Sequence, residues 1–174
     1  MTVALGTTPL AAVKVADEVW MAMAMLHCKR PEQSDFSIAE ILEFARTCQE
    51  LRRLGPLRKG FYVHVVQHSV ANRPPNPARY RMLFETAPGR RRLFRPGDAY
   101  HPEREGGKVC PAKDDLIENW FSGLLTWYRD VWCAAGMKKT LEQDPLLALR
   151  GSGKHIWADE HADEYVRNLR EGWE

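Results

Sequence analysis

The first third of the chain carries apolar residues at helical spacing. Val15, Val19 and Met23 recur at every fourth position, and the alanines between them favour helix, so the pattern predicts a helix over residues 15–28. Residues 1–12 are small and show no period, and we expect them to form a flexible arm.

The residues at 36–41 indicate the start of a second helix. Ser37 is followed three positions later by Glu40, which matches a capping box, where the hydroxyl and the carboxylate each satisfy a backbone N–H. Phe36 stands where a hydrophobic staple would face Ile41. These residues predict a helix over 37–48, followed by a turn at 54–56.

Residues 57–72, with the sequence LRKGFYVHVVQHSVAN, fit two structures. Their four valines favour a strand. Their period favours a helix, with Tyr62 and Val66 on one face and His64, Gln67 and His68 on the other. We prefer the helix, over about 58–71. The three prolines at 74, 75 and 77 then exclude both helix and central strand.

The rest of the pattern predicts a hairpin, one more helix and a tail. Residues 79–84 alternate between arginine and apolar positions, a turn follows at 87–89, and residues 90–95 return as the partner strand, with Leu93 facing inward. Residues 114–133 form a strongly amphipathic pattern, and 163–173 have helical spacing. The expected fold class is α+β and mostly helical.

Charge is distributed unevenly along the 174 residues, whose net charge is only +2. Residues 52–95 hold eleven basic side chains and a single acidic one, Glu85, an excess of ten. Such a segment repels itself unless an anion lies against it, and nucleic acid phosphate is the commonest partner. The alternatives are a solvated basic face that binds nothing, or RNA stacked on Tyr80 and Phe84.

The order of three helices and a two-stranded hairpin resembles a winged helix-turn-helix domain over about residues 13–98. The resemblance implies that helix 37–48 supports a recognition helix at 58–71, that the hairpin 79–95 is a basic wing, and that the partner is double-stranded DNA bound by a homodimer. Glutamine suits adenine, histidine can donate to guanine, and arginines contact phosphates. The candidate DNA-binding residues are Arg58, Lys59, His64, Gln67, His68, Asn72, Arg73, Arg79, Arg81, Arg90, Arg91, Arg92 and Arg95.

Residues 141–174 form a tail too small to fold alone. Its last 25 residues resemble the C-terminal tails of bacterial antitoxins that neutralise PIN-domain ribonuclease toxins, with the likeness carried by Gly151, Gly153, Lys154, Trp157, Asp163, Glu164, Tyr165, Val166, Leu169, Arg170 and Trp173. The resemblance implies an antitoxin-like transcriptional regulator whose tail docks a toxin. Alternatively, the tail covers the 114–133 helix, which would otherwise serve as a packing or dimerisation element within residues 99–140. The candidate partner-binding residues are Lys154, Trp157, Tyr165, Leu169, Arg170 and Trp173.

Catalytic and metal-binding motifs are incomplete in this sequence. His64 and His68 have the i, i+4 spacing of a zinc protease, but Val65 occupies the place of the required glutamate. The segment 151–154 lacks the flanking residues of a phosphate loop. We therefore expect a protein that is not an enzyme and has no metal and no cofactor. A non-catalytic nucleic-acid-recognition subunit of a restriction or defence system is the alternative function.

The expected location is the cytoplasm of a bacterium. The four cysteines form no CxxC pair, and the first residues lack the pattern of an export signal. The longest apolar runs are far shorter than the ~20 residues that cross a bilayer, so no membrane association is expected.

Overall fold

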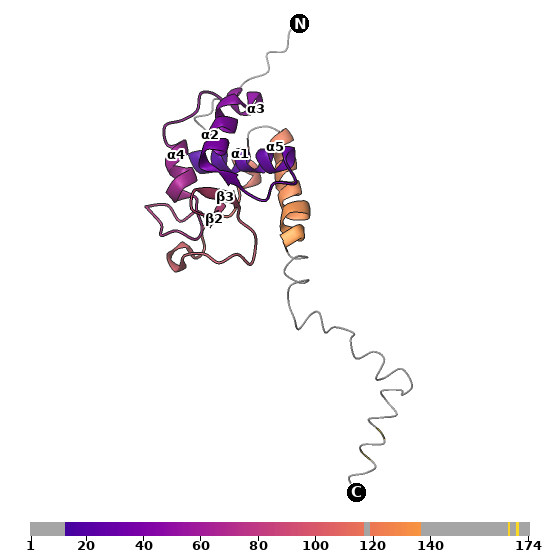
Figure 1. Cartoon of the computed structure of the whole chain (residues 1–174). Helices are drawn as coiled ribbons and strands as arrows, with labels where there is room; N and C mark the ends of the chain where they lie inside the picture. Colours follow the sequence, from indigo (N-terminus) through magenta and orange to yellow (C-terminus); the bar gives the residue numbers. More distant parts are fainter. Residues whose placement is uncertain (1–12, 117–118, 137–166, 168–169, 171–174) are drawn as a thin grey trace. The chain divides into compact units, whose positions relative to one another are not determined.

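The computed structural model describes residues 13–116, 119–136, 167 and 170. The chain divides into two units, residues 1–133 and 134–174, and we call the first unit the body (Figure 1). Its elements are α1 (Val15–Lys29), β1 (Phe36–Ser37), α2 (Ile38–Thr47), α3 (Gln49–Arg52), α4 (Phe61–Val63) continued by the π-helix η2 (His64–His68), β2 (Leu83–Ala87), β3 (Arg90–Leu93), the 3₁₀ turns η3 (Pro102–Arg104) and η4 (Lys113–Asp115), and α5 (Asn119–Trp127) continued by the π-helix η5 (Tyr128–Cys133).

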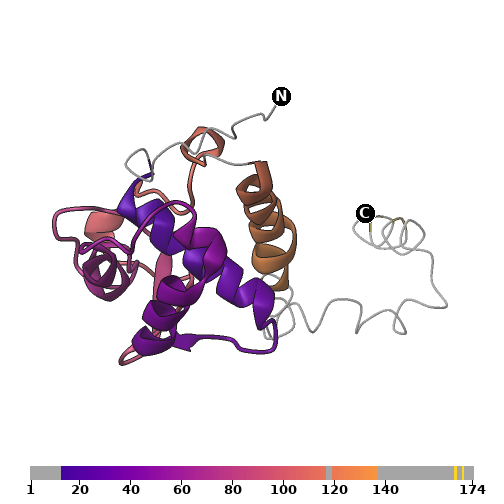
Figure 2. The same cartoon turned by 90° about the horizontal axis from the view of Figure 1, so that it is seen from above.

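α1 is the central element of the body. It contacts α2, α4, η2, β3 and α5, and Figure 2 shows it running through the middle of the body. Every residue from 16 to 27 is buried, as is typical of a helix within a core, and the three methionines fill that core. The buried stretch includes Asp17 and Glu18, so this helix needs cationic partners from elsewhere in the chain.

α2 begins as the sequence predicts. The Ser37 hydroxyl accepts a hydrogen bond from the Glu40 backbone N–H at 3.2 Å, and the Glu40 carboxylate accepts one from the Ser37 backbone N–H at 2.8 Å. Hydrogen bonds to the Glu40 carboxylate, the strongest of them from the Ser37 backbone N–H, lower the pKa of Glu40 to about 2. Phe36 and Ile41 are both fully buried at this helix start, and the capping box is confirmed.

The sheet has three antiparallel strands in the order β1-β3-β2. β2 and β3 form the predicted hairpin, and its turn contains Gly89 at φ +75°, a conformation that suits the third position of a type II turn after Pro88. β1 pairs with β3 through Phe36 and Ser37. The sequence pattern predicts only two strands, because β1 is too short to show alternation.

The inward face of β3 carries an arginine. Leu93 is buried, as predicted, and Arg91 is buried beside it. Residues two apart in a strand share a face, so the position of Leu93 also fixes that of Arg91. Arg91, one of the candidate DNA-binding residues, therefore lies in the core rather than on the outward face of the hairpin.

The helix predicted over 114–133 is described from α5 through η5, after the separate turn η4. Its apolar stripe packs against α1 and the rest of the body. The Tyr128 ring meets Trp20 edge-on with 5.5 Å between centroids, and the Tyr128 hydroxyl donates to the Phe94 carbonyl at 2.7 Å. Trp132 and Phe121 are also buried. This face is thus a packing surface of the body.

No helix within the described residues is both long and apolar enough to span a membrane. The expected arm at 1–12 lies outside the described residues, as does nearly all of the tail at 141–174. Within the tail, Arg167 and Arg170 are helical and exposed.

Candidate nucleic-acid interface

α4 and η2 together form the helix predicted at about 58–71, although it spans only residues 61–68. The segment is helical rather than extended, which confirms that preference. Phe61 and Val65 are buried in the core, whereas Tyr62 is 53% exposed and Val63 is 41% exposed. Lys59, just before the helix, is exposed as well. The exposed side of α4 therefore consists of Tyr62 and Val63, with the cation of Lys59 just before the helix.

Three side chains expected to form an exposed reading face are half-buried in the structure. His64 Nδ1 lies 3.0 Å from Ser69 Oγ, and its ring packs edge-on against His68 with 5.0 Å between centroids. Burial, with a further contribution from His68, lowers the pKa of His64 to about 4, so its ring is neutral at pH 7. The Gln67 amide donates to the Pro74 carbonyl at 2.7 Å.

The π-helix accounts for the difference. The Ser69 backbone N–H donates to the carbonyl of His64, five residues earlier, at 3.0 Å. Such i→i+5 bonding widens the turn, so residues 64–68 no longer follow the 3.6-residue period from which the faces were assigned.

Two buried arginines bind the carbonyls of residues 65–68, at the end of this helix. Arg91 donates to the first two at 3.2 and 3.3 Å, and Arg104 donates to the last two, each at 2.9 Å. The final carbonyls of a helix lack partners within it and carry the negative end of its dipole. The two guanidinium groups therefore cap the proposed recognition helix from inside the protein.

Arg104 is fully buried and makes no ion pair within the described residues. Besides the two helix carbonyls, it donates to the carbonyls of Arg73, Pro74, Ala78 and Tyr80 at 2.6–3.2 Å. Burial lowers the pKa of this guanidinium. Sequence reasoning missed Arg104, because it stands in a polar stretch between two glutamates that gives no sign of burial.

Glu85 neutralises two of the predicted DNA-binding arginines. Its carboxylate accepts two hydrogen bonds from Arg73, at 2.6 and 2.8 Å, and one from Arg91 at 2.8 Å. The bond from Arg73 makes the largest contribution to lowering the pKa of Glu85. Asn72 pairs through its side-chain amide with the Glu85 backbone at 2.9 and 3.0 Å. Asn72, Arg73 and Arg91 thus have structural partners.

Arg90, Arg92 and Arg95 also have partners within the fold. Arg90 binds Asp35 at 2.6 Å, and Arg92 binds Asp98 at 2.6 Å. Arg92 also lies over the Phe84 ring, 4.5 Å from its centroid. Arg95 lies over Trp132 at 3.9 Å, and burial lowers the pKa of its guanidinium. The side chain of Arg90 remains 41% exposed, which leaves it the most accessible member of these pairs.

Two further candidates pack against the body. Arg58 donates to Glu18 at 2.9 Å and to the Val13 carbonyl at 2.6 Å. Arg81 lies over the Tyr100 ring at 4.3 Å and donates to the Gly107 carbonyl at 3.2 Å. The side chains of Arg58 and Arg81 therefore already have partners within the fold.

Of the eleven basic residues at 52–95, only Arg53, Lys59 and Arg79 are exposed and have side chains with no hydrogen-bond or ion-pair partner among the described residues. Most of the positive charge in this segment is therefore paired or packed within the fold. Most arginines of the hairpin are thus paired with carboxylates within the fold.

Metal-ligating residues do not converge in the described part of the chain, where no group of three His, Cys, Asp or Glu side chains is close enough to hold an ion. Of the candidate partner-binding residues, only Arg170 is described; Lys154, Trp157, Tyr165, Leu169 and Trp173 lie outside the described residues. The chain matches no protein-family model, no curated protein and no solved structure.

Proposed function

We propose that residues 13–98 act as a winged helix-turn-helix domain that binds double-stranded DNA in a transcriptional regulator. The observation that carries the proposal is the element order. A helix, a short strand, three further helices, the last of which is continued by a π-helix, and a hairpin follow one another, and the short strand pairs with the second strand of the hairpin. This arrangement is compatible with a helix presented to a major groove and a hairpin beside it.

The proposed reading surface differs from the one expected from the sequence. It consists of Lys59, Tyr62 and Val63, which are the exposed positions around α4. Apolar side chains can contact thymine methyl groups, and a tyrosine hydroxyl can bind a phosphate or a base edge. The cations of the segment 52–95 that could contact phosphates are Arg53, Lys59 and Arg79. Arg90 is partly exposed but is paired with Asp35.

Salt dependence measures how many cations take part. The logarithm of the binding constant falls linearly with the logarithm of the salt concentration. The slope is about −0.9 for each phosphate that the protein neutralises. Three cations predict a slope of about −3, whereas ten would predict about −9. We expect the shallow slope, because six arginines of the segment are paired with Glu18, Asp35, Glu85 or Asp98.

The test is fluorescence anisotropy of the full chain with labelled DNA from upstream of its own reading frame, titrated from low to high salt. Tyr62→Ala should weaken binding about tenfold or more. Val131→Ala, at an equally exposed apolar position on η5, should not change binding. An absence of binding at low salt, or equal effects of the two variants, would overturn the proposal.

The same proposal assigns the tail, residues 141–174, the role of docking a partner protein. A second protein, such as a PIN-type toxin, would bind residues 141–174, and the chain itself would carry no catalysis. Removing residues 141–174 should abolish co-purification with that partner while leaving DNA affinity unchanged. Loss of DNA binding with the wild-type unfolding curve retained would contradict the assignment of the two roles to two units.

A further inference from the structure

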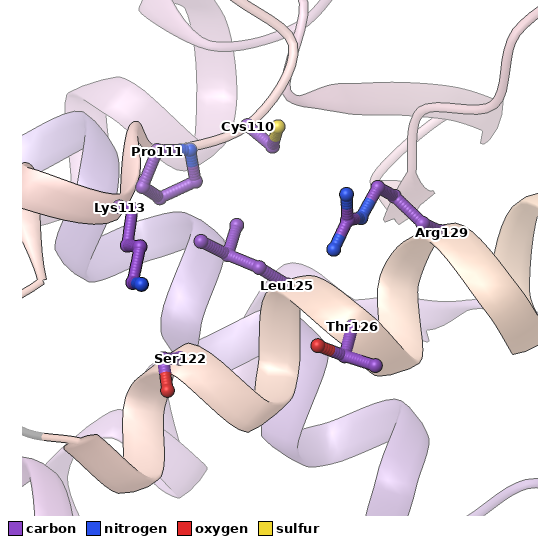
Figure 3. A pocket seen from close by; sticks show the side chains of 7 residues that line it. All are labelled: Cys110, Pro111, Lys113, Ser122, Leu125, Thr126 and Arg129. Atoms are coloured by element: carbon purple, nitrogen blue, oxygen red, sulfur yellow. The ribbon is translucent and has the colours of Figure 1, made fainter.

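A cavity of about 430 Å³ lies outside the proposed DNA-binding domain. One wall is a single face of α5 and η5, where Ser122, Leu125, Thr126 and Arg129 follow one another at helical spacing. The other wall is the segment 110–113, which contributes Cys110, Pro111 and Lys113 (Figure 3). The opposite face of the same helix is the one that packs on the body.

The chemistry of the lining is that of a receptor for an anion with an apolar part. Arg129 and Lys113 supply two positive charges, and no acidic residue is among the seven described lining residues. Thr126 adds a hydroxyl, while Leu125 and Pro111 supply apolar surface. Guanidinium groups bind carboxylates and phosphates through two parallel hydrogen bonds, which favours an anionic head group at Arg129.

Both walls are held in place by contacts that do not involve the cavity. Lys108, two residues before Cys110, bridges the carboxylates of Asp17 at 2.8 Å and Asp115 at 2.6 Å. Its backbone carbonyl also accepts from the Arg81 N–H at 2.8 Å. On the helix side, the Tyr128 hydroxyl is bonded to the Phe94 carbonyl. The cavity is therefore preformed, which lowers the entropic cost of binding.

The size of the cavity selects the class of ligand. A volume of about 430 Å³ lies within the ~300–1,000 Å³ typical of small-molecule sites and is far larger than an inorganic anion needs. We propose that this cavity binds a small organic anion, a carboxylate or phosphate monoester with an apolar body, with its charged group on Arg129 and its apolar body against Leu125. The site is separate from the proposed DNA-binding surface, so each proposal can fail without the other.

The experiment is ligand-observed NMR with calorimetry on the full chain, without DNA. The probes are phenyl phosphate and benzoate, with neutral benzyl alcohol and inorganic phosphate as comparisons. We expect the two organic anions to bind and the two comparison compounds to bind at least tenfold more weakly. Arg129→Gln should weaken phenyl phosphate binding about tenfold or more, because it removes a charged donor.

Arg46→Gln is the matched control, since Arg46 is exposed on α2 and does not line the cavity. It should leave binding unchanged. A second readout is alkylation of Cys110, followed by mass spectrometry, which bound phenyl phosphate should slow while exposed Cys28 reacts at the same rate. The proposal is overturned if neither organic anion binds, if inorganic phosphate binds as tightly as phenyl phosphate, or if the two arginine variants behave alike.

Discussion

Replacing Arg104 with lysine tests whether the buried guanidinium organises the segment that follows the proposed recognition helix. Arg104 uses five N–H donors to serve six backbone carbonyls, two of them at the end of η2 and four in the segment 73–80. Lysine keeps the positive charge but has three donors on a single nitrogen. At least half of these carbonyls would lose their partner or depend on water.

The expected cost follows from these bonds. A hydrogen bond from a charged donor contributes about 1.5–3 kcal/mol, and breaking one side of a buried charged arrangement costs about 3–5 kcal/mol. We take about 4 kcal/mol for Arg104→Lys, which is a large part of the ~5–15 kcal/mol by which domains are usually stable. With a urea dependence of about 2 kcal/mol per molar, the unfolding midpoint should fall by about 2 M.

The assay is urea unfolding followed by circular dichroism, with Arg79→Lys as the control. Arg79 is exposed and has no partner among the described residues, so its exchange should change stability by less than about 0.5 kcal/mol. Amide hydrogen exchange should show faster opening at residues 67–80 in Arg104→Lys than in the wild type. An unchanged midpoint with an unchanged slope would refute the reasoning, because it would mean that these carbonyls need no guanidinium.

Three further outcomes are expected, from the counter-ion of a buried arginine, from the buried histidine and from the capping box of α2. Glu85→Gln should lower the free energy of unfolding by about 3 kcal/mol, because it leaves buried Arg91 without a counter-ion. The control Glu103→Gln, at an exposed site, should leave the free energy of unfolding unchanged. Equal urea midpoints for the two variants would contradict this prediction. His27 is buried with its pKa lowered to about 3 by burial and by Arg95, so below pH 6.5 only the unfolded state takes up its proton. Stability should then fall by about 1.4 kcal/mol for each pH unit down to about pH 3, and urea midpoints from pH 7 to 5 should show a steeper decline for the wild type than for His27→Gln. Ser37→Ala should lower the free energy of unfolding by about 1 kcal/mol through loss of the capping box, and a midpoint equal to that of Ser34→Ala, at an exposed loop position, would contradict that role.

Sequence reasoning predicts those elements that depend on near neighbours. The capping box at Ser37, the methionine-rich core helix and the Pro88-Gly89 turn are each specified by residues within a few positions, and the structure has all three. It fails where a remote residue decides the outcome. The faces of residues 64–68 depend on the π-helical turn, and β1 exists only because β3 lies beside it. Neither feature leaves a local period in the sequence.

The same distinction explains why a count of charges along the chain does not show which arginines already have partners within the fold. A count along the chain records which charges are close in sequence, whereas neutralisation depends on which charges are close in space. Glu18 lies 40 residues before Arg58, and Asp35 lies 55 residues before Arg90, yet both carboxylates bind those arginines. The acidic flanks of the basic segment are therefore its counter-ions within the fold. A basic stretch flanked by acidic ones predicts a polyanion site only after these internal pairs have been subtracted. Among the described residues of the segment 52–95, the exposed cations that remain without a side-chain partner are Arg53, Lys59 and Arg79. If the domain binds DNA as proposed, shape and the apolar face of α4 should therefore contribute more to its affinity than arginine–phosphate contacts do.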